Sequence, residues 1–311
     1  PHTWVSTSWC HFNDFGGSGS PHRATPFRNT SRISNKCNWS TIFLVVNSSD
    51  ETSVTLAARD LTVSIGQKKI IRSISAELQP GTVSVLIGPN GAGKSTLLAG
   101  LAGSLAGYSG SITLDNAPIG SFSPAQLAKR RAVMMQSDNL VFDFTVNDVV
   151  RMGLIRRPDP LYAEHTDLIE RLSEKCGIRH LLPQSILTLS GGERQRTHFC
   201  RCLMQVWHDE RPPDNGYLLL DEPTSSQDVA NELAILNLVR DAAHKGLGVL
   251  IVLHDLNLAA HFGDIFYLLK SGEVAAHGAR DEVMTEAVLS NVYETPVEIE
   301  LRDGKMRIYT F

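Results

Sequence analysis

Apolar and polar positions follow two different patterns along this chain, and together they predict a mixed α/β fold. Between Thr55 and Gln79 the two kinds of residue alternate as in half-buried strands, so we expect antiparallel strands there. After Gly81, continuous apolar runs such as TVSVLI at 82–87 and YLLL at 217–220 alternate with segments of helical spacing. Continuous apolar strands separated by helices are typical of a parallel sheet with crossover connections. The expected fold class is therefore α/β, with a mixed β core and an antiparallel β subdomain.

A third pattern lies in the middle of the chain. Two segments with helical spacing, Thr145–Arg156 and Leu161–Cys176, follow one another with few strand-like runs between them. We expect an α-helical subdomain over about residues 137–200. The polar stretch Trp207–Gly216 comes after it and predicts a surface loop.

The two ends of the chain differ in pattern. Residues 1–53 are rich in Ser, Thr, Asn, Gly and His, so we expect a disordered or non-native N-terminal extension there. Since Met134 is the first methionine, Val54 is a candidate for a start read from an alternative codon, and residues 54–311 then form one functional domain. At the far end, Pro296–Phe311 alternates apolar and polar residues around Asp303-Gly304, which predicts a β-hairpin.

A glycine-rich turn, GPNGAGKS, follows the apolar run at 82–87 and precedes a helical segment. Such a turn directs successive backbone N–H groups inward at a helix N-terminus, an arrangement that binds polyphosphate. Lys94 is expected to reach the β- and γ-phosphate oxygens, Ser95 to bind Mg²⁺, and Thr96 to assist at the α- or β-phosphate. A purely structural strand-to-helix turn is the alternative. The expected nucleotide-binding residues are Gly88, Pro89, Asn90, Gly91, Ala92, Gly93, Lys94, Ser95 and Thr96.

Two adjacent carboxylates, Asp221 and Glu222, follow the apolar run YLLL at the strand end where open parallel sheets place ligands. Asp221 is expected to hold Mg²⁺, and Glu222 to polarise the water that attacks the γ-phosphate. Capping of the next helix is the alternative role for such a pair. The order DEPT, with Pro223 and Thr224 next in the chain, favours the catalytic interpretation.

Two further polar residues end apolar runs. Gln136 ends RAVMMQ and His254 ends GVLIVLH, so we expect both to leave the core at the edge that carries Glu222. We expect Gln136 and His254 to face the γ-phosphate region and to join Glu222 as catalytic residues, with Gln136 also a Mg²⁺ ligand beside Ser95 and Asp221. A lone histidine at a strand end is more often structural, but its place in this series of motifs favours catalysis.

Between these motifs lies a segment, Leu189–Arg196, that reads LSGGERQR. In the order GPNGAGKS, Gln136, LSGGERQR, YLLLDEPT, SSQD and VLHD, the sequence from about Ser53 to Phe311 resembles the ATP-binding subunits of ABC transporters. The resemblance implies a P-loop NTPase of ABC type that uses ATP and Mg²⁺. It also implies a homodimer in which one copy touches the ATP held by the other. The residues implied for this role are Ser190, Gly191, Gly192 and Glu193, with Asp228 linking the two sites.

Three phrases, RRAVMMQ, FTVNDVVRMG and VLHDLNLAAHF, further resemble the ATP-binding subunits of haem importers. This likeness implies two transmembrane permease subunits as partners, a substrate-binding protein that acts through them, and a peripheral place at the cytoplasmic face of the inner membrane. Ferric siderophore and cobalamin remain alternative cargoes, because the cargo of such importers never touches the ATPase. Residues 142–146 are candidates for a groove that receives a permease helix, and core packing is the equal alternative.

The sequence departs from the family pattern at Ile65. ATPases of this family usually have an aromatic residue there that stacks on adenine, and here the base would rest on an aliphatic side chain. Since aromatic stacking contributes about 0.5 to 1.5 kcal/mol beyond area burial, we expect a modest loss of affinity and a weaker preference for ATP over GTP.

Composition narrows the possible partners. A net charge of −4 and a pI near 6.3 argue against a nucleic-acid surface and against simple adhesion to anionic lipid. No apolar run is long enough to span a bilayer, so membrane attachment is expected to come through a protein partner. Cys176, Cys200 and Cys202 lie in helical segments, which fits a reducing compartment without disulfides.

Two rival functions remain from other classes. A soluble ABC ATPase that acts on ribosomes would carry two cassettes, and one that acts on DNA would carry a long heptad insert, whereas this chain has one cassette and no such insert. An inactive module that uses ATP only to join two subunits would not need Glu222, His254 and Gln136.

Overall fold

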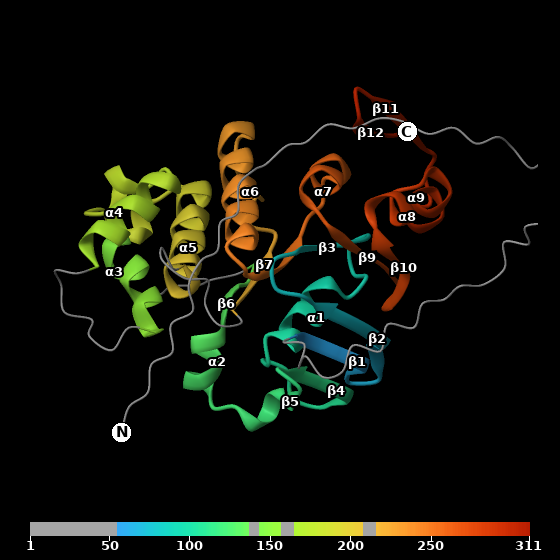
Figure 1. Cartoon of the computed structure of the whole chain (residues 1–311), viewed down its shortest axis with the longest axis horizontal. Coiled ribbons are helices and arrows are strands. Elements are labelled where there is room, and N and C mark those ends of the chain that lie inside the picture. The colour runs from blue at the N-terminus through green and yellow to red at the C-terminus, as the bar shows by residue number, and fades with distance from the viewer. Residues whose placement is uncertain (1–54, 137–142, 157–164, 208–215) are drawn as a thin grey trace, which may run out of the picture. The chain divides into compact units, whose positions relative to one another are not determined.

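The computed structural model describes residues 55–136, 143–156, 165–207 and 216–311 (Figure 1). The expectations for residues 1–53 and for Val54 lie outside these ranges, as do residues 137–142 and most of the polar stretch 207–216. The candidate site residues named above lie within the described ranges.

A six-stranded sheet forms the centre, in the order β10-β9-β3-β8-β7-β6. Its strands β9, β3, β8, β7 and β6 are parallel, and β10 pairs with β9 in the antiparallel sense at the edge. The strands β3, β7 and β8 are buried along their whole length, as their continuous apolar runs predicted. The bounds are β3 Val83–Ile87, β6 Arg131–Met134, β7 Tyr217–Asp221, β8 Gly248–Val252, β9 Ile265–Lys270 and β10 Glu273–Ala279.

This sheet separates two apolar cores. Successive residues of a strand face opposite sides, so in β7 Leu218 and Leu220 enter one core while Tyr217 and Leu219 enter the other. The first core packs the sheet against helices, and the second packs it against an antiparallel sheet and the helix after β3. Burial on both faces explains why these strands are apolar at nearly every position; Ser84 in β3 and Asp221 at the end of β7 are buried polar residues.

The antiparallel sheet has the order β2-β1-β4-β5. Its first two strands pair from Leu56 opposite Leu78 to Ile65 opposite Lys68, which confirms the antiparallel strands predicted at 55–79. Helix α1 packs against it from the second core, and α2 begins after a capping box at Ser123. The bounds are β1 Leu56–Ile65, β2 Lys68–Leu78, β4 Tyr108–Leu114, β5 Ala117–Pro118, α1 Lys94–Leu101 and α2 Pro124–Arg130.

Helices α3 Val146–Arg151, α4 Thr166–Lys175 and α5 Gly191–Val206 form a group beside β6 in Figure 1. The segment of helical spacing at 145–156 contains two successive helices, because α3 ends at Arg151 and a 3-10 helix continues to Arg156. A Cβ on Gly153 would lie 2.4 Å from the backbone oxygen of Arg201, so this segment runs directly against α5.

The surface loop expected from Trp207 is wrong at its first residue. Trp207 is only 4% exposed and belongs to the first core, where the Lys245 ammonium lies 4.7 Å from its ring centroid. A large aromatic ring can be buried in the core even where the residues that follow it in the sequence are polar.

The C-terminal third alternates helices with the last parallel strands. Its helices are α6 Val229–His244, α7 Leu256–Phe262, α8 Arg280–Val283 and α9 Glu286–Tyr293. The predicted hairpin is confirmed as β11 Val297–Arg302 and β12 Lys305–Thr310, and its turn residues Asp303 and Gly304 have φ angles of 51° and 73°. None of the helices in the described ranges is long and apolar enough to cross a bilayer. The thiols of Cys176, Cys200 and Cys202 are buried, and none of the three forms a disulfide bond within the described residues.

Candidate nucleotide site

The phosphate loop, Gly88–Ser95, connects β3 to α1 and is held tightly from behind. Gly88 has φ 139°, and a Cβ there would lie 2.2 Å from the backbone oxygen of Leu269 in β9. Glycine is required on both counts, because the backbone angle and the space exclude a side chain. The hydroxyl of Tyr293, at the end of α9, interacts with the backbone of Gly88, and burial raises the pKa of this tyrosine to about 12.

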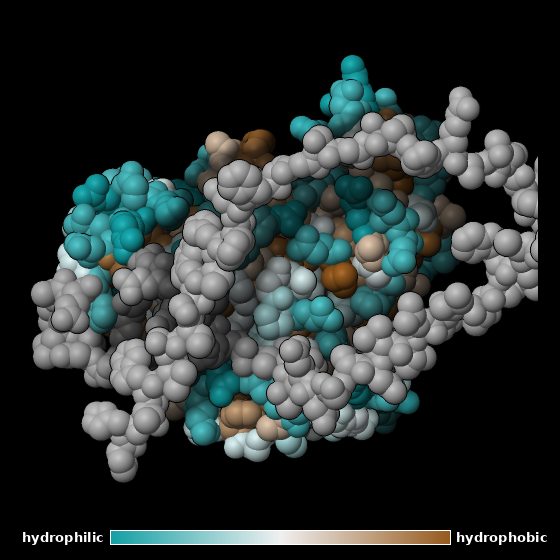
Figure 2. Space-filling model, viewed as in Figure 1, coloured by the Kyte–Doolittle hydropathy of each residue, from teal (hydrophilic) through white to brown (hydrophobic). Residues whose placement is uncertain are grey.

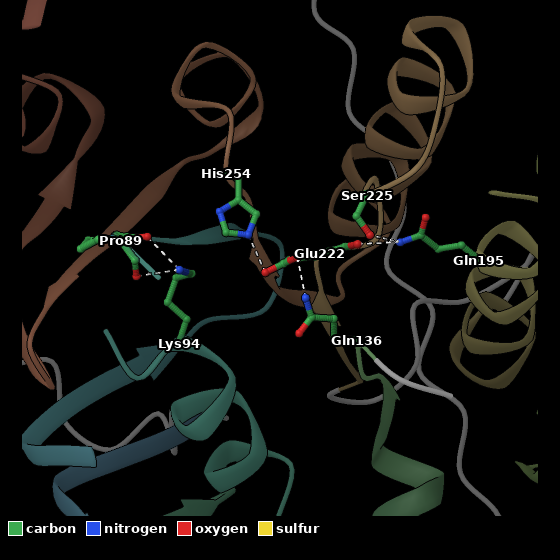
Figure 3. A network of polar contacts seen from close by, with 8 residues as sticks. Pro89, Lys94, Gln136, Gln195, Glu222, Ser225 and His254 are labelled. Carbon is green, nitrogen blue, oxygen red and sulfur yellow. Dashed lines mark hydrogen bonds and ion pairs between the residues drawn. The ribbon is translucent and has the colours of Figure 1, made fainter. Parts of the chain in front are cut away.

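Lys94 is preformed within this loop. Its side chain is 6% exposed, and Nζ donates hydrogen bonds to the backbone oxygens of Gly88 at 2.8 Å and Pro89 at 3.1 Å (Figure 3). Burial lowers the pKa of Lys94, and the nearby carboxylates of Glu222 and Asp221 act in the opposite direction. A buried ammonium ion between backbone carbonyls and two carboxylates is well placed to bind an anion with several oxygens.

Asp221 ends β7 in a buried position that suits a cation. It is 1% exposed, and within the described residues neither carboxylate oxygen accepts a hydrogen bond of normal geometry. Burial raises the pKa of Asp221, while the Ser95 side chain and then Lys94 stabilise its ionised form. A buried carboxylate of this kind is costly unless a cation or water binds it, so Asp221 and Ser95 fit a Mg²⁺ site.

Glu222 is held between the ends of two neighbouring strands. Gln136, after β6, donates Nε2 to Glu222 Oε2 at 3.0 Å, and His254, after β8, places Nε2 2.5 Å from Glu222 Oε1. The three residues meet because β6, β7 and β8 are adjacent and parallel, so their carboxyl ends share one edge. In Figure 3 the amide oxygen of Gln136 points away from Glu222, which leaves an atom of the type that Mg²⁺ binds.

The backbone of Glu222 is itself unusual. Its φ is 52°, in the left-handed region that side-chain-bearing residues rarely adopt. The backbone oxygen of Glu222 accepts hydrogen bonds from Ser225 N at 3.2 Å and from Gln195 Nε2 at 2.7 Å. Tertiary contacts therefore hold the catalytic candidate in a strained conformation.

The sequence did not single out Gln195 or Gln227, although both join the signature segment, Leu189–Arg196, to the loop after β7. Gln195 donates to the Ser225 hydroxyl at 2.8 Å, and Gln227 Nε2 donates to Gly192 O at 3.0 Å and to Gln195 Oε1 at 2.9 Å. Arg196 donates to Gln227 Oε1 at 2.8 Å. A glutamine has no motif of its own, so only the tertiary contact reveals this role.

The start of α5 carries the rest of the signature segment. Ser190 and Glu193 form a capping box, in which Ser190 N and Oγ donate to Glu193 Oε2 at 2.9 and 2.7 Å, and Glu193 N donates back to Ser190 Oγ at 3.3 Å. With Gly191, Gly192 and Asp228 these residues line an open hollow of about 540 Å³. Within the described residues, no hydrogen bond joins the signature segment to the phosphate loop of the same chain.

Comparison with known proteins places these motifs in a family. Residues 71–225 match the ABC transporter family. A hemin import ATP-binding protein of Bordetella bronchiseptica is 41% identical over 247 residues, covering 79% of this chain and 94% of that protein. A protein of the same name from Bradyrhizobium diazoefficiens is 38% identical over 252 residues, covering 81% and 93%. The chain belongs to the ABC transporter ATP-binding subunits. It is an ATP-binding and ATP-hydrolysing subunit of a transporter.

Solved structures agree with this ABC ATPase in fold. One is an ATP-binding subunit of an ABC transporter, with a TM-score of 0.67 at 21% identity, covering 78% of this chain and 98% of that chain. Another is a metal-chelate type ABC transporter in an inward-facing conformation, with a TM-score of 0.64 at 20% identity, covering 83% and 97%. The α/β fold with a mixed sheet and an antiparallel β subdomain is confirmed.

In this ABC ATPase the remaining predicted residues lie around the phosphate loop. Ser95, Asn90 and Gly91 are exposed and Thr96 is half-buried at the start of α1, while Ala92 is buried. Ile65 lies at the end of β1, and its side chain is 68% exposed. The contact between Ile65 and adenine that the sequence leads us to expect stays a prediction.

Proposed function

We propose that this ATPase energises haem uptake through a membrane permease. The proposal is supported by two relatives near 40% identity whose names specify hemin import. Ferric siderophore and cobalamin remain the alternative cargoes expected from the sequence. In the proposed importer the cargo would touch the binding protein and the permease and not the ATPase, so the uptake experiment below decides between the cargoes.

The phosphate loop is proposed to hold ATP. Lys94 would exchange its contacts with Gly88 and Pro89 for phosphate oxygens, and the start of α1 would add its N–H groups. Thr96 follows within the first turn and is proposed to assist at the α- or β-phosphate. Ser95, Gln136 and Asp221 are proposed to hold Mg²⁺. When bound, this ion would neutralise part of the negative charge of the phosphates.

The main support for a role in ATP hydrolysis is that two side chains contact the carboxylate of Glu222. Gln136 and His254 each engage one of its carboxylate oxygens, which fixes the group at the sheet edge beyond Lys94 (Figure 3). We assign Glu222 to orient and polarise the attacking water, and His254 to keep Glu222 and the γ-phosphate in register. A fixed carboxylate works without reorganisation at the moment of attack.

The signature segment is proposed to complete the site of a second copy. The hollow beside Ser190 is open and lies apart from the phosphate loop of its own chain, so its residues serve a γ-phosphate from elsewhere. Ser190, Gly191, Gly192 and Glu193 would contact the ATP of the partner copy, and Asp228 would link the two sites across the homodimer. ATP binding would then bring two copies together, and hydrolysis would separate them.

Transport partners follow from the proposed importer. Two permease subunits would bind the helical region near Phe144, which is half-buried beside the buried Val146, and a substrate-binding protein would act through them. The ATPase would lie at the cytoplasmic face of the inner membrane, attached through the permease.

Uptake into proteoliposomes tests this proposal. The vesicles would contain this subunit with its co-purifying permease, and the cognate binding protein would deliver haem or a ferric siderophore. We expect ATP-driven haem accumulation that Glu222→Gln abolishes. Siderophore uptake alone would keep the importer and discard haem, whereas transport of neither would overturn the proposal.

A further inference from the structure

The segment after His254 is short and needs outside support. Helix α7 has seven residues, and Asp255 caps it by accepting hydrogen bonds from Asn257 N at 2.7 Å and Leu258 N at 3.0 Å. His254 directly precedes this cap, so its backbone moves with the first turn of α7. A helix of this length is not stable by itself, and its position depends on what it packs against.

The terminal hairpin supplies that support through one side chain. Asn257 Nδ2 donates to Ile308 O at 3.1 Å, and Ile308 N donates to Asn257 Oδ1 at 2.7 Å. Ile308 lies opposite Ile299 in the β11–β12 ladder, and both of its backbone groups point to Asn257. The Asn257 side-chain amide thus forms the hydrogen bonds that a neighbouring strand would form at the outer edge of β12. Ile308 is only 6% exposed, so both bonds lie at a buried position.

The hairpin is fixed on its other side as well. Val297 N donates to Ser290 Oγ at 3.0 Å and Ile299 N donates to Glu286 Oε1 at 2.8 Å, so β11 is attached to α9. The hairpin lies beside α7 and α9 at the top of Figure 1, and its surface there is mainly hydrophilic in Figure 2. Its apolar side is used inward, where Ile308 and Val297 join the first core.

We infer that Asn257 is a positioning residue for His254, because it fastens the turn that carries this histidine to the rigid terminal hairpin. The inference rests on the proposed role of His254 at Glu222. One turn of chain connects the two contacts: His254 contacts Glu222 at one end, and Asn257 is hydrogen-bonded to β12 at the other. Loss of the hydrogen bonds between Asn257 and Ile308 leaves the phosphate loop intact and allows His254 to move away from Glu222.

The test is steady-state ATP hydrolysis by Asn257→Ala, with Asn237→Ala as the matched control at an exposed position of α6. We expect Asn257→Ala to lower kcat about tenfold with an unchanged KM for ATP, because misplacement of a catalytic group affects the chemical step. Asn257→Asp keeps the acceptor for Ile308 N and should retain intermediate activity; it also serves if the alanine variant fails to fold. Asn237→Ala should match the unmodified protein.

A double-variant cycle separates positioning from general loosening of the fold. In a His254→Ala background, Asn257→Ala should cause no further fall in kcat. An unchanged kcat in Asn257→Ala, or the same further fall without His254, would overturn the inference while His254 keeps its role. If His254→Ala itself leaves kcat unchanged, the proposed role of His254 fails and the inference fails with it.

Discussion

Helices α1 and α5 both begin at glycine-containing motifs, yet the N-terminus of α1 lacks a side-chain cap and that of α5 has one. Helix α1 starts at Lys94 with no side-chain cap, and its loop is closed from behind by Leu269. Helix α5 starts with a complete capping box, in which Ser190 and Glu193 satisfy each other. Hydrogen bonds from Ser190 lower the pKa of the half-buried Glu193, so this cap stays anionic.

This difference separates a site that is ready from a site that must be opened. The uncapped N–H groups of α1 can donate directly to phosphate oxygens, and Lys94 has only to exchange two neutral backbone oxygens for them. At α5, by contrast, Ser190 already donates its hydroxyl to Glu193, so an incoming phosphate has to replace a carboxylate. A single copy should therefore bind ATP at α1 and engage α5 only when a second copy supplies the phosphate.

The largest expected effect comes from Glu222→Gln. This variant should stop ATP hydrolysis while both helix N-termini can still bind ATP. Loss of the carboxylate should reduce hydrolysis by about 10² to 10⁴-fold, the usual contribution of a positioned acid or base. ATP binding should persist, so closed dimers should accumulate on size-exclusion chromatography with ATP. Unchanged turnover would remove Glu222 from the catalytic role.

The next effect distinguishes the two helix starts directly. Lys94→Ala should weaken ATP binding to the single copy about 10 to 100-fold, as expected for loss of a charged hydrogen bond. Ser190→Ala should leave that binding unchanged and reduce ATP-dependent dimerisation instead. Calorimetry on dilute protein measures the first, and analytical ultracentrifugation measures the second. Equal loss of single-copy binding in both variants would break the comparison.

Glycine substitutions offer a steric version of the same contrast. Gly88→Ala would place a Cβ 2.2 Å from the Leu269 oxygen, so it should distort the phosphate loop and lower the melting temperature. At Gly191 nothing lies within 4 Å of an added Cβ, so Gly191→Ala should fold as stably as the unmodified protein and affect only dimerisation. Thermal unfolding of both variants tests this difference. An equal fall in melting temperature would contradict the difference in packing at the two glycines.

The smallest effect is expected from Glu193→Gln. The amide keeps a partner for Ser190 but removes the negative charge beside the start of α5, where a second phosphate would arrive. Charges at a helix terminus contribute about 0.3 to 1 kcal/mol, so ATP-driven dimerisation should strengthen about twofold to fivefold. A titration of dimer formation against ATP concentration tests this, and weaker dimerisation would show that the contact of Glu193 with the partner's ATP needs the negative charge.

Sequence patterns predicted the parts of this molecule that local rules determine. Buried strands, the phosphate loop, Glu222 and the hairpin at Asp303-Gly304 all follow from periodicity or motif order. The patterns gave no sign of Asn257, Gln195 or Tyr293, because each acts through a backbone group distant in the sequence: Ile308, Glu222 and Gly88. Trp207 misled for a related reason, since its polar neighbours are local and the core that buries it is not.

At Glu222 the left-handed backbone lowers the stability of the protein, whereas the carboxylate side chain serves its activity. A residue other than glycine in this conformation costs about 1 to 3 kcal/mol, and the fold tolerates it because the surrounding contacts hold the chain there. Glycine at this position would relieve the strain and remove the carboxylate at once. A library selected for thermostability alone should therefore enrich glycine at position 222 and yield proteins that are more robust yet catalytically silent. Engineering a heat-resistant form of this ATPase would need a screen that demands turnover at every round.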